Sequence, residues 1–112
     1  MNIQFATSKM RKLCNNYKKL TKKYGLEQAK LIRRRLDEIF ASENLAVLGS
    51  LPQARCHELK GILKGKLSVD IAQPYRLIFS PADNPIPLKK DGGLDWEKVR
   101  NVIVDKVEDP HG

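Results

Sequence analysis

Three short segments in the middle of the chain combine side chains that could act on a phosphodiester. They are Arg-Cys-His-Glu-Leu-Lys-Gly at 55–61, Lys-Gly-Lys-Leu-Ser-Val-Asp at 64–70 and Tyr-Arg-Leu-Ile-Phe at 75–79. If the segments form adjacent strands, their cationic and titratable groups meet on one surface. Histidine can transfer protons near neutral pH, and arginine or lysine can stabilise the added charge of a pentacovalent phosphorus. The pattern predicts a basic surface that can bind nucleic acid and cleave it.

Arg76 is the leading candidate for the group that stabilises the transition state. It stands in an otherwise apolar segment, where a guanidinium is costly to bury without a partner. The alternative is a structural ion pair with Asp70 or Asp105.

Lys60, Lys66 and His57 are further catalytic candidates. Either lysine could contact phosphate, or transfer a proton if desolvation lowers its pKa, but a solvated strand lysine is an equal alternative. His57 suits general acid or base chemistry, although a hydrogen bond to Glu58 or to a backbone carbonyl would give it a structural role. Lys64, in the same stretch, is assigned to RNA binding.

The positive charge of the chain lies in its first third. Residues 1–35 hold eleven Lys and Arg against the single Glu27, a net +10, so that the remainder of a chain of net charge +8 carries −2. Such a field could steer the protein toward RNA phosphates, although a lysine-rich helix is often only a solvated face. The candidate RNA-binding side chains of this region are Lys18, Lys19, Lys22, Lys23, Arg33 and Arg34.

Hydrophobic spacing predicts two helices joined at Gly25. Met10, Leu13, Tyr17, Leu20 and Tyr24 recur every three or four residues, and Thr7 or Ser8 can cap the start of this helix. A second helix is expected over 26–42, and Arg33, Arg34 and Arg35 fall largely outside its apolar stripe. That stripe consists of Ala29, Ile32, Leu36, Ile39 and Phe40.

Strands are expected at 2–6, 67–71, 75–79 and 100–107, with a brief helical turn at 45–48 capped by Asn44 and a loop over 81–93. The length of 112 residues allows one domain, 1–112. We therefore expect an α+β fold, in which a small antiparallel sheet carries the N-terminal helical hairpin on one face.

Composition narrows the class of protein. No apolar run approaches the ~18 residues that span a bilayer, and the N-terminal residues lack a signal-peptide pattern, so a cytoplasmic protein without membrane contact is expected. The two cysteines, Cys14 and Cys56, are expected to be free thiols. Carboxylates, His and Cys do not cluster at ligand spacing, so neither a metal nor another cofactor is expected.

Five motifs together resemble a known family. They are the segment 55–61, Lys-Gly at 64–65, Tyr-Arg-Leu-Ile-Phe at 75–79, Gly-Leu-Asp-Trp at 93–96 and Glu-Asp-Pro-His-Gly at 108–112. In this order they resemble the HigB branch of the RelE/ParE toxins of bacterial toxin-antitoxin systems, often labelled plasmid maintenance killer proteins. The resemblance extends over essentially the whole chain and implies a RelE-like fold.

The resemblance implies the toxin of a type II toxin-antitoxin system. Such a toxin is a ribonuclease that enters the ribosomal A site, cleaves messenger RNA without a metal and so inhibits translation. A HigA-like antitoxin with a helix-turn-helix would hold it inactive, and the pair would bind operator DNA through the antitoxin.

The resemblance also assigns site residues. The phosphate-stabilising arginine of the family falls on Arg76, and the Glu-Asp-Tyr-His-Gly signature places Asp109 and His111 in the site. Here Pro110 replaces the tyrosine, which removes a stacking ring and a backbone donor. Two alternatives therefore stay open, a ParE-like toxin that binds DNA gyrase and a catalytically degenerate protein that only binds RNA or the antitoxin.

Overall fold

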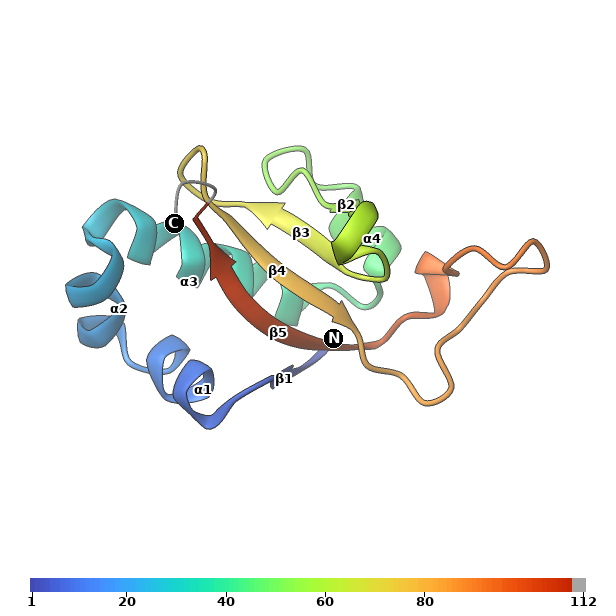
Figure 1. Cartoon of the computed structure of the whole chain (residues 1–112), viewed down its shortest axis with the longest axis horizontal. Coiled ribbons are helices and arrows are strands. Elements are labelled where there is room, and N and C mark those ends of the chain that lie inside the picture. The colour runs from blue at the N-terminus through green and yellow to red at the C-terminus, as the bar shows by residue number, and fades with distance from the viewer. Residues whose placement is uncertain (110–112) are drawn as a thin grey trace.

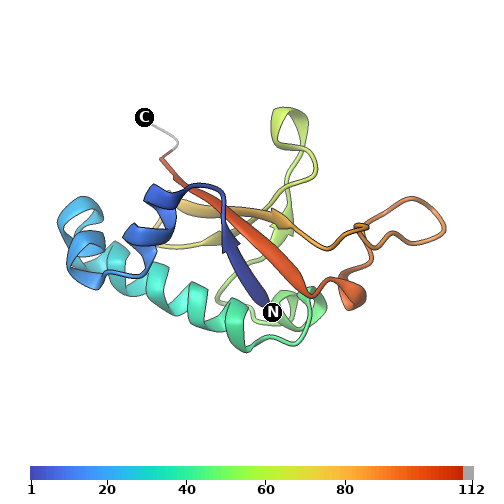
Figure 2. The same ribbon diagram turned by 90° about the horizontal axis from the view of Figure 1, so that it is seen from below.

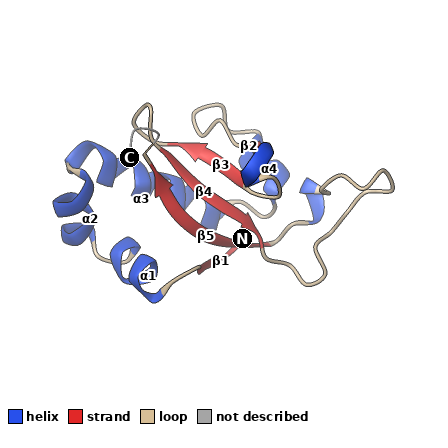
Figure 3. Ribbon diagram, in the orientation of Figure 1, coloured by secondary structure: helices blue, strands red, loops and turns tan. Residues whose placement is uncertain are grey.

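Five strands form one mixed sheet in the order β1-β5-β4-β3-β2 (Figures 1 and 3). The computed structural model describes residues 1–109. Neighbouring strands are antiparallel except for β1, which runs parallel to β5. The strands are β1 (Asn2–Phe5), β2 (His57–Glu58), β3 (Leu67–Asp70), β4 (Arg76–Pro81) and β5 (Asn101–Glu108). The predicted α+β class is confirmed, and the parallel β1–β5 pair is the one departure from an antiparallel sheet.

The first predicted helix is divided in two. Thr7 caps the first part as expected, since its side chain accepts a hydrogen bond from the Met10 amide at 3.0 Å. Asn16 then caps the second part by accepting from the Lys19 amide at 3.1 Å. Asparagine side chains compete with the helical backbone hydrogen bonds in this way, so the prediction of one continuous helix was wrong at this point.

The helices are α1 (Ser8–Cys14), α2 (Tyr17–Tyr24), α3 (Leu26–Ala41) and α4 (Leu45–Gly49), with 3₁₀ turns η1 (Gly61–Leu63) and η2 (Trp96–Lys98).

The hydrophobic core lies between α3 and one face of the sheet. Figure 2 shows α3, in teal, passing below the sheet, while the connection between β2 and β3 rises on the other side. Ile32, Leu36 and Ile39 of α3 are buried in the same cluster as Leu77 and Phe79 of β4. The α2 helix packs mainly on α3 and extends beyond the sheet (Figure 1).

Two expectations for α3 were wrong. Phe40, which was placed in the buried stripe, is 71% exposed, whereas Arg35, which was placed largely outside it, is only 5% exposed. The Arg35 guanidinium donates to the carbonyl oxygens of Asp70 (2.7 Å) and Gln53 (2.9 Å) and to the Glu38 carboxylate (3.0 Å). These bonds satisfy the buried charge and fasten α3 to the end of β3.

Candidate nucleic-acid site on the open face of the sheet

The alternation of side chains along the strands builds a site on the face opposite the helices. Leu77 and Val69 point into the core, so their neighbours point the other way. The register pairs Ser68 with both His57 of β2 and Ile78 of β4. His57 and Arg76 therefore project from the same open face.

Arg76 and His57 border the same open surface from two sides. They lie two strands apart, about 10 Å, and two residues apart along the strands, about 7 Å. Ser68 and Ile78 stand between them, and the Arg76 guanidinium bonds Glu108 of β5, on the side of β4 away from β2. A cation and an imidazole thus face the same surface without contacting each other.

Arg76 forms an ion pair with Glu108 of β5. The Nη2 atom donates to the Glu108 carboxylate at 2.9 Å, and the two side chains remain 30% and 20% exposed. Neither of the two partners suggested by the sequence pairs with Arg76. Asp70 contacts Arg55 and Gln73, and Asp105 contacts Lys66. Within residues 1–109, Nε and Nη1 of Arg76 have no hydrogen-bond acceptor, so part of the guanidinium fork is available to phosphate.

Lys66 forms a close ion pair with Asp105. Lys66 precedes β3 and Asp105 belongs to β5, so the pair crosses over β4, the strand between them. The register of β5 against β4 shifts between Ile78 and Phe79, and a bulge of this kind re-aims side chains on the bulged strand. The irregularity therefore accounts for a carboxylate that faces the site.

His57 is exposed and its tautomer is fixed by a backbone contact. Its Nδ1 atom lies 2.9 Å from the Arg55 carbonyl oxygen. Because a carbonyl can only accept, Nδ1 carries the proton of the neutral ring, and Nε2 is the basic nitrogen. The contact with the Arg55 carbonyl thus leaves Nε2 free to accept a hydrogen bond or a proton.

Lys60 and Lys64 lie away from this centre. Both line a cavity of about 800 Å³ between the β2–β3 connection and the loop that follows β4. Its other wall is apolar and includes Ile86, Leu88 and Leu94. The structure therefore brings His57, Lys66 and Arg76 to one face and places Lys60 and Lys64 at its border.

The C-terminal candidates are described only in part. Asp109 follows directly after Glu108 at the end of β5 and is exposed. His111, and Pro110 before it, lie outside the described residues.

The basic residues of the helices form a separate region. Lys18, Lys19, Lys22 and Lys23 are exposed on α2, and Arg34 is exposed on α3. Arg33 differs, because it pairs with Asp37 at 2.9 Å and donates to the Cys14 carbonyl at 3.1 Å. Arg33 thereby joins α3 to α1, which reduces its availability to RNA.

The cysteines are unsuited to nucleophilic chemistry. Both are free, as expected. Burial raises the pKa of the Cys14 thiol to about 11, partly opposed by Arg33, and burial together with Glu58 raises that of Cys56 to about 12. Both therefore remain protonated at neutral pH.

Two features are absent from the described residues. No group of three or more His, Cys, Asp or Glu among residues 1–109 could hold a metal ion. In the same range no helix has the length and apolarity to cross a membrane.

Sequence reasoning missed three features of this face. It did not pair Glu108 with Arg76 or Asp105 with Lys66, because both contacts depend on the order of the strands. It also passed over Ser68, whose hydroxyl is buried between His57 and Ile78 and has no hydrogen-bond partner within the described chain. The sequence did contain a signal for Ser68, because a polar residue in a run of buried strand positions needs a hydrogen-bond partner.

Comparison with known proteins gives one family. A family model described as the RelE-like toxin of the type II toxin-antitoxin system HigB matches residues 4–88. No individual curated protein matches the chain. The matched range includes His57, Lys66 and Arg76 but ends before β5, so it carries no support for Asp109 or His111.

Proposed function

Because the chain belongs to the HigB-like family of RelE-like toxins of type II toxin-antitoxin systems, we propose that it is a ribosome-dependent endoribonuclease that cleaves messenger RNA. The toxin has a cognate antitoxin as its partner, as its family implies, and we propose that this antitoxin is a HigA-like protein that carries the operator contacts. The proposed place of action is the cytoplasm, where messenger is translated. The observation that supports the nuclease is the presence of Arg76 and His57 on the same open face of the sheet.

The proposed reaction is attack of the substrate's 2′-hydroxyl on the adjacent phosphorus. The O2′–P bond forms and the P–O5′ bond breaks, which leaves a 2′,3′-cyclic phosphate and a 5′-hydroxyl. Nε2 of His57 takes the 2′ proton, and the Lys66 ammonium gives a proton to the departing 5′-oxygen. Arg76 stabilises the charge on the phosphorus oxygens, so the chemistry requires no metal.

Four other residues have proposed roles in the same reaction. Asp109, which directly follows β5, and His111, two residues later in the sequence, are further candidates for proton transfer or its support. Lys60 and Lys64 would hold flanking phosphates at the border of the site, where their contacts are independent of sequence.

The direct test of the nuclease is to map messenger ends by primer extension in a translating extract. We expect cuts within codons that appear only when ribosomes translate the message. A control reaction contains the same messenger and protein without ribosomes. Intact messenger together with growth arrest would instead indicate a target such as gyrase, and intact messenger without arrest would indicate a degenerate toxin.

The Lys66–Asp105 pair predicts opposite effects of two substitutions on RNA binding. Asp105→Asn removes the carboxylate that competes with phosphate for Lys66, so single-stranded RNA should bind about two- to fivefold more tightly. Lys66→Ala should weaken binding and lower the slope of log K against log salt by about 0.7. Fluorescence polarisation between 50 and 200 mM salt measures both.

The matched control for this pair is Glu43→Gln, since Glu43 is an exposed carboxylate 3.9 Å from Arg100, on the connection between α3 and α4. If Glu43→Gln and Asp105→Asn change RNA binding equally, the effect is one of net charge, and Lys66 has no specific contact with phosphate.

A further inference from the structure

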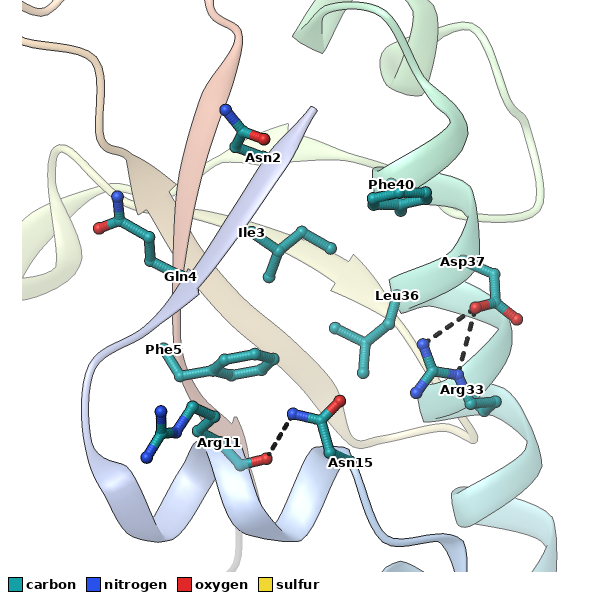
Figure 4. Close-up of a pocket in the computed structure, with 10 residues that line it drawn as sticks. All are labelled: Asn2, Ile3, Gln4, Phe5, Arg11, Asn15, Arg33, Leu36, Asp37 and Phe40. Atoms are coloured by element: carbon teal, nitrogen blue, oxygen red, sulfur yellow. Dashed lines mark hydrogen bonds and ion pairs between the residues drawn. The ribbon is translucent and has the colours of Figure 1, made fainter.

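A groove runs between β1 and α3, on the helical side of the sheet and apart from the proposed nuclease site. Its volume is about 740 Å³, and its walls come from β1, α1 and α3. Figure 4 shows Ile3 and Phe5 of β1 pointing toward Leu36 and Phe40 of α3. The groove therefore presents apolar side chains from two elements.

Phe40 is the residue of the groove that most strongly indicates a binding site. It is 71% exposed, although Leu36, one turn earlier on the same helix, and the preceding residue Ile39 are buried. An exposed aromatic ring at the border of an apolar groove is typical of a protein-protein contact site, because binding a partner there removes a large apolar surface from water. The sequence placed Phe40 in the apolar stripe, and that stripe continues past the core into the groove.

The backbone of β1 offers a second kind of contact. The amides of Asn2 and Ala6 donate to the carbonyl oxygens of Arg100 (3.0 Å) and Val104 (2.8 Å), on the β5 side. Alternate residues of a strand face opposite edges, so the N–H and C=O groups of Ile3 and Phe5 face away from β5. Since β1 ends the strand order within residues 1–109, this edge is open to another strand.

The groove is held in place before any partner binds. The Met1 amino group donates to the carbonyl oxygens of Ile39 (3.2 Å), Phe40 (2.9 Å) and Ser42 (2.5 Å) at the end of α3. These bonds fix the start of β1 beside the helix, so a partner need not order the two elements.

The charge around the groove favours an acidic occupant. Arg11 and Arg33 line it, and residues 1–35 carry a net +10. Asp37, the one acidic residue of the lining, already pairs with Arg33. A segment with carboxylates beside alternating apolar residues would satisfy both the charge and the apolar floor.

We propose that the cognate antitoxin binds here, through an extended segment that adds to the open edge of β1 as a sixth strand. Its backbone pairs with Ile3 and Phe5, its alternate apolar side chains cover Phe40, and its carboxylates face Arg11. The proposal uses the antitoxin partnership of the family and does not depend on the nuclease. It leaves the open sheet face uncovered, so the antitoxin could hold the toxin without filling its active site.

The test uses the full-length toxin and its purified cognate antitoxin. Phe40→Glu should weaken their affinity by about 30-fold, the effect of losing one buried aromatic contact. Ile62→Glu is the matched control, because Ile62 is a fully exposed apolar residue of η1 outside the groove, and it should change affinity less than twofold. Circular dichroism establishes that both variants fold.

Hydrogen exchange tests the added strand itself. In the complex, the amides of Ile3 and Phe5 should exchange at least tenfold more slowly than in the free toxin, whereas those already paired to β5 should change little. An unchanged affinity of Phe40→Glu, or slowed exchange only at other segments, would overturn the proposal. A free toxin that sediments as a dimer, lost in Phe40→Glu, would overturn it in favour of a second copy. Both measurements omit ribosomes, so a failure of the nuclease proposal leaves them intact.

Discussion

Replacing Arg76 by alanine is expected to lower messenger cleavage by about 100- to 1,000-fold. Removal of one positioned donor to a charged transition state has an effect of this size. Arg76 is half-buried on the open sheet face, and among residues 1–109 it bonds only Glu108, through its Nη2 atom. Its remaining donors are therefore available to the phosphorus oxygens, whose charge increases during the reaction. Single-turnover cleavage on programmed ribosomes measures the loss.

The variants around Arg76 separate catalysis from folding. Arg76→Ala leaves the Glu108 carboxylate without its partner, so the double variant Arg76→Ala with Glu108→Gln should be equally inactive if the loss is catalytic. Arg76→Lys keeps the charge but loses the planar fork, and should retain only part of the rate. Lys98→Ala, which removes an exposed cation of η2, should cleave like the wild type. Cleavage by Arg76→Ala at the wild-type rate would remove Arg76 from the mechanism.

The sequence predicted the elements that depend on local signals. Thr7 and Asn44 cap helices as expected, because a side-chain oxygen accepting from the third following amide is a local contact. The apolar spacing of Ile32, Leu36 and Ile39 likewise identified the buried face of α3. The direction of β1 could not be predicted, since alternation along a strand does not reveal which strand it joins or with what polarity.

The same limit applies to the site. The segment 75–79 is apolar except for Arg76, so the sequence predicted a strand there but not which of its side chains would face away from the core. The ion pairs of the open face could not be predicted either, because Glu108 and Asp105 meet Arg76 and Lys66 only through the strand order. Phe40 shows a related limit of sequence-based prediction. Its hydrophobicity indicates that burial is favourable, but not whether it is buried within this chain or against a partner.

Arg35→Ala is expected to destabilise the fold by about 3 to 5 kcal/mol, the cost of breaking a buried charge network. It leaves the carbonyls of Asp70 and Gln53 without their donor, and the Glu38 carboxylate without its cation. Arg34→Ala, one residue earlier, removes an exposed guanidinium and should change stability by less than about 0.5 kcal/mol. The midpoint of urea unfolding compares them, and equal midpoints would show that the Arg35 contacts contribute little.

The position of Arg35 also connects stability with activity. Its Nε atom bonds the carbonyl of Asp70, the residue of β3 that is paired with Arg76 across the β3–β4 ladder. The helix thereby anchors the strand pair that carries the proposed phosphate-binding side chain. At low temperature, where Arg35→Ala is still folded, cleavage should fall more than folded content does. If cleavage by Arg35→Ala falls only in proportion to its folded fraction, Arg35 has a role in stability alone. Arg35→Lys should restore cleavage only in part, because lysine cannot bond all three acceptors in the same plane.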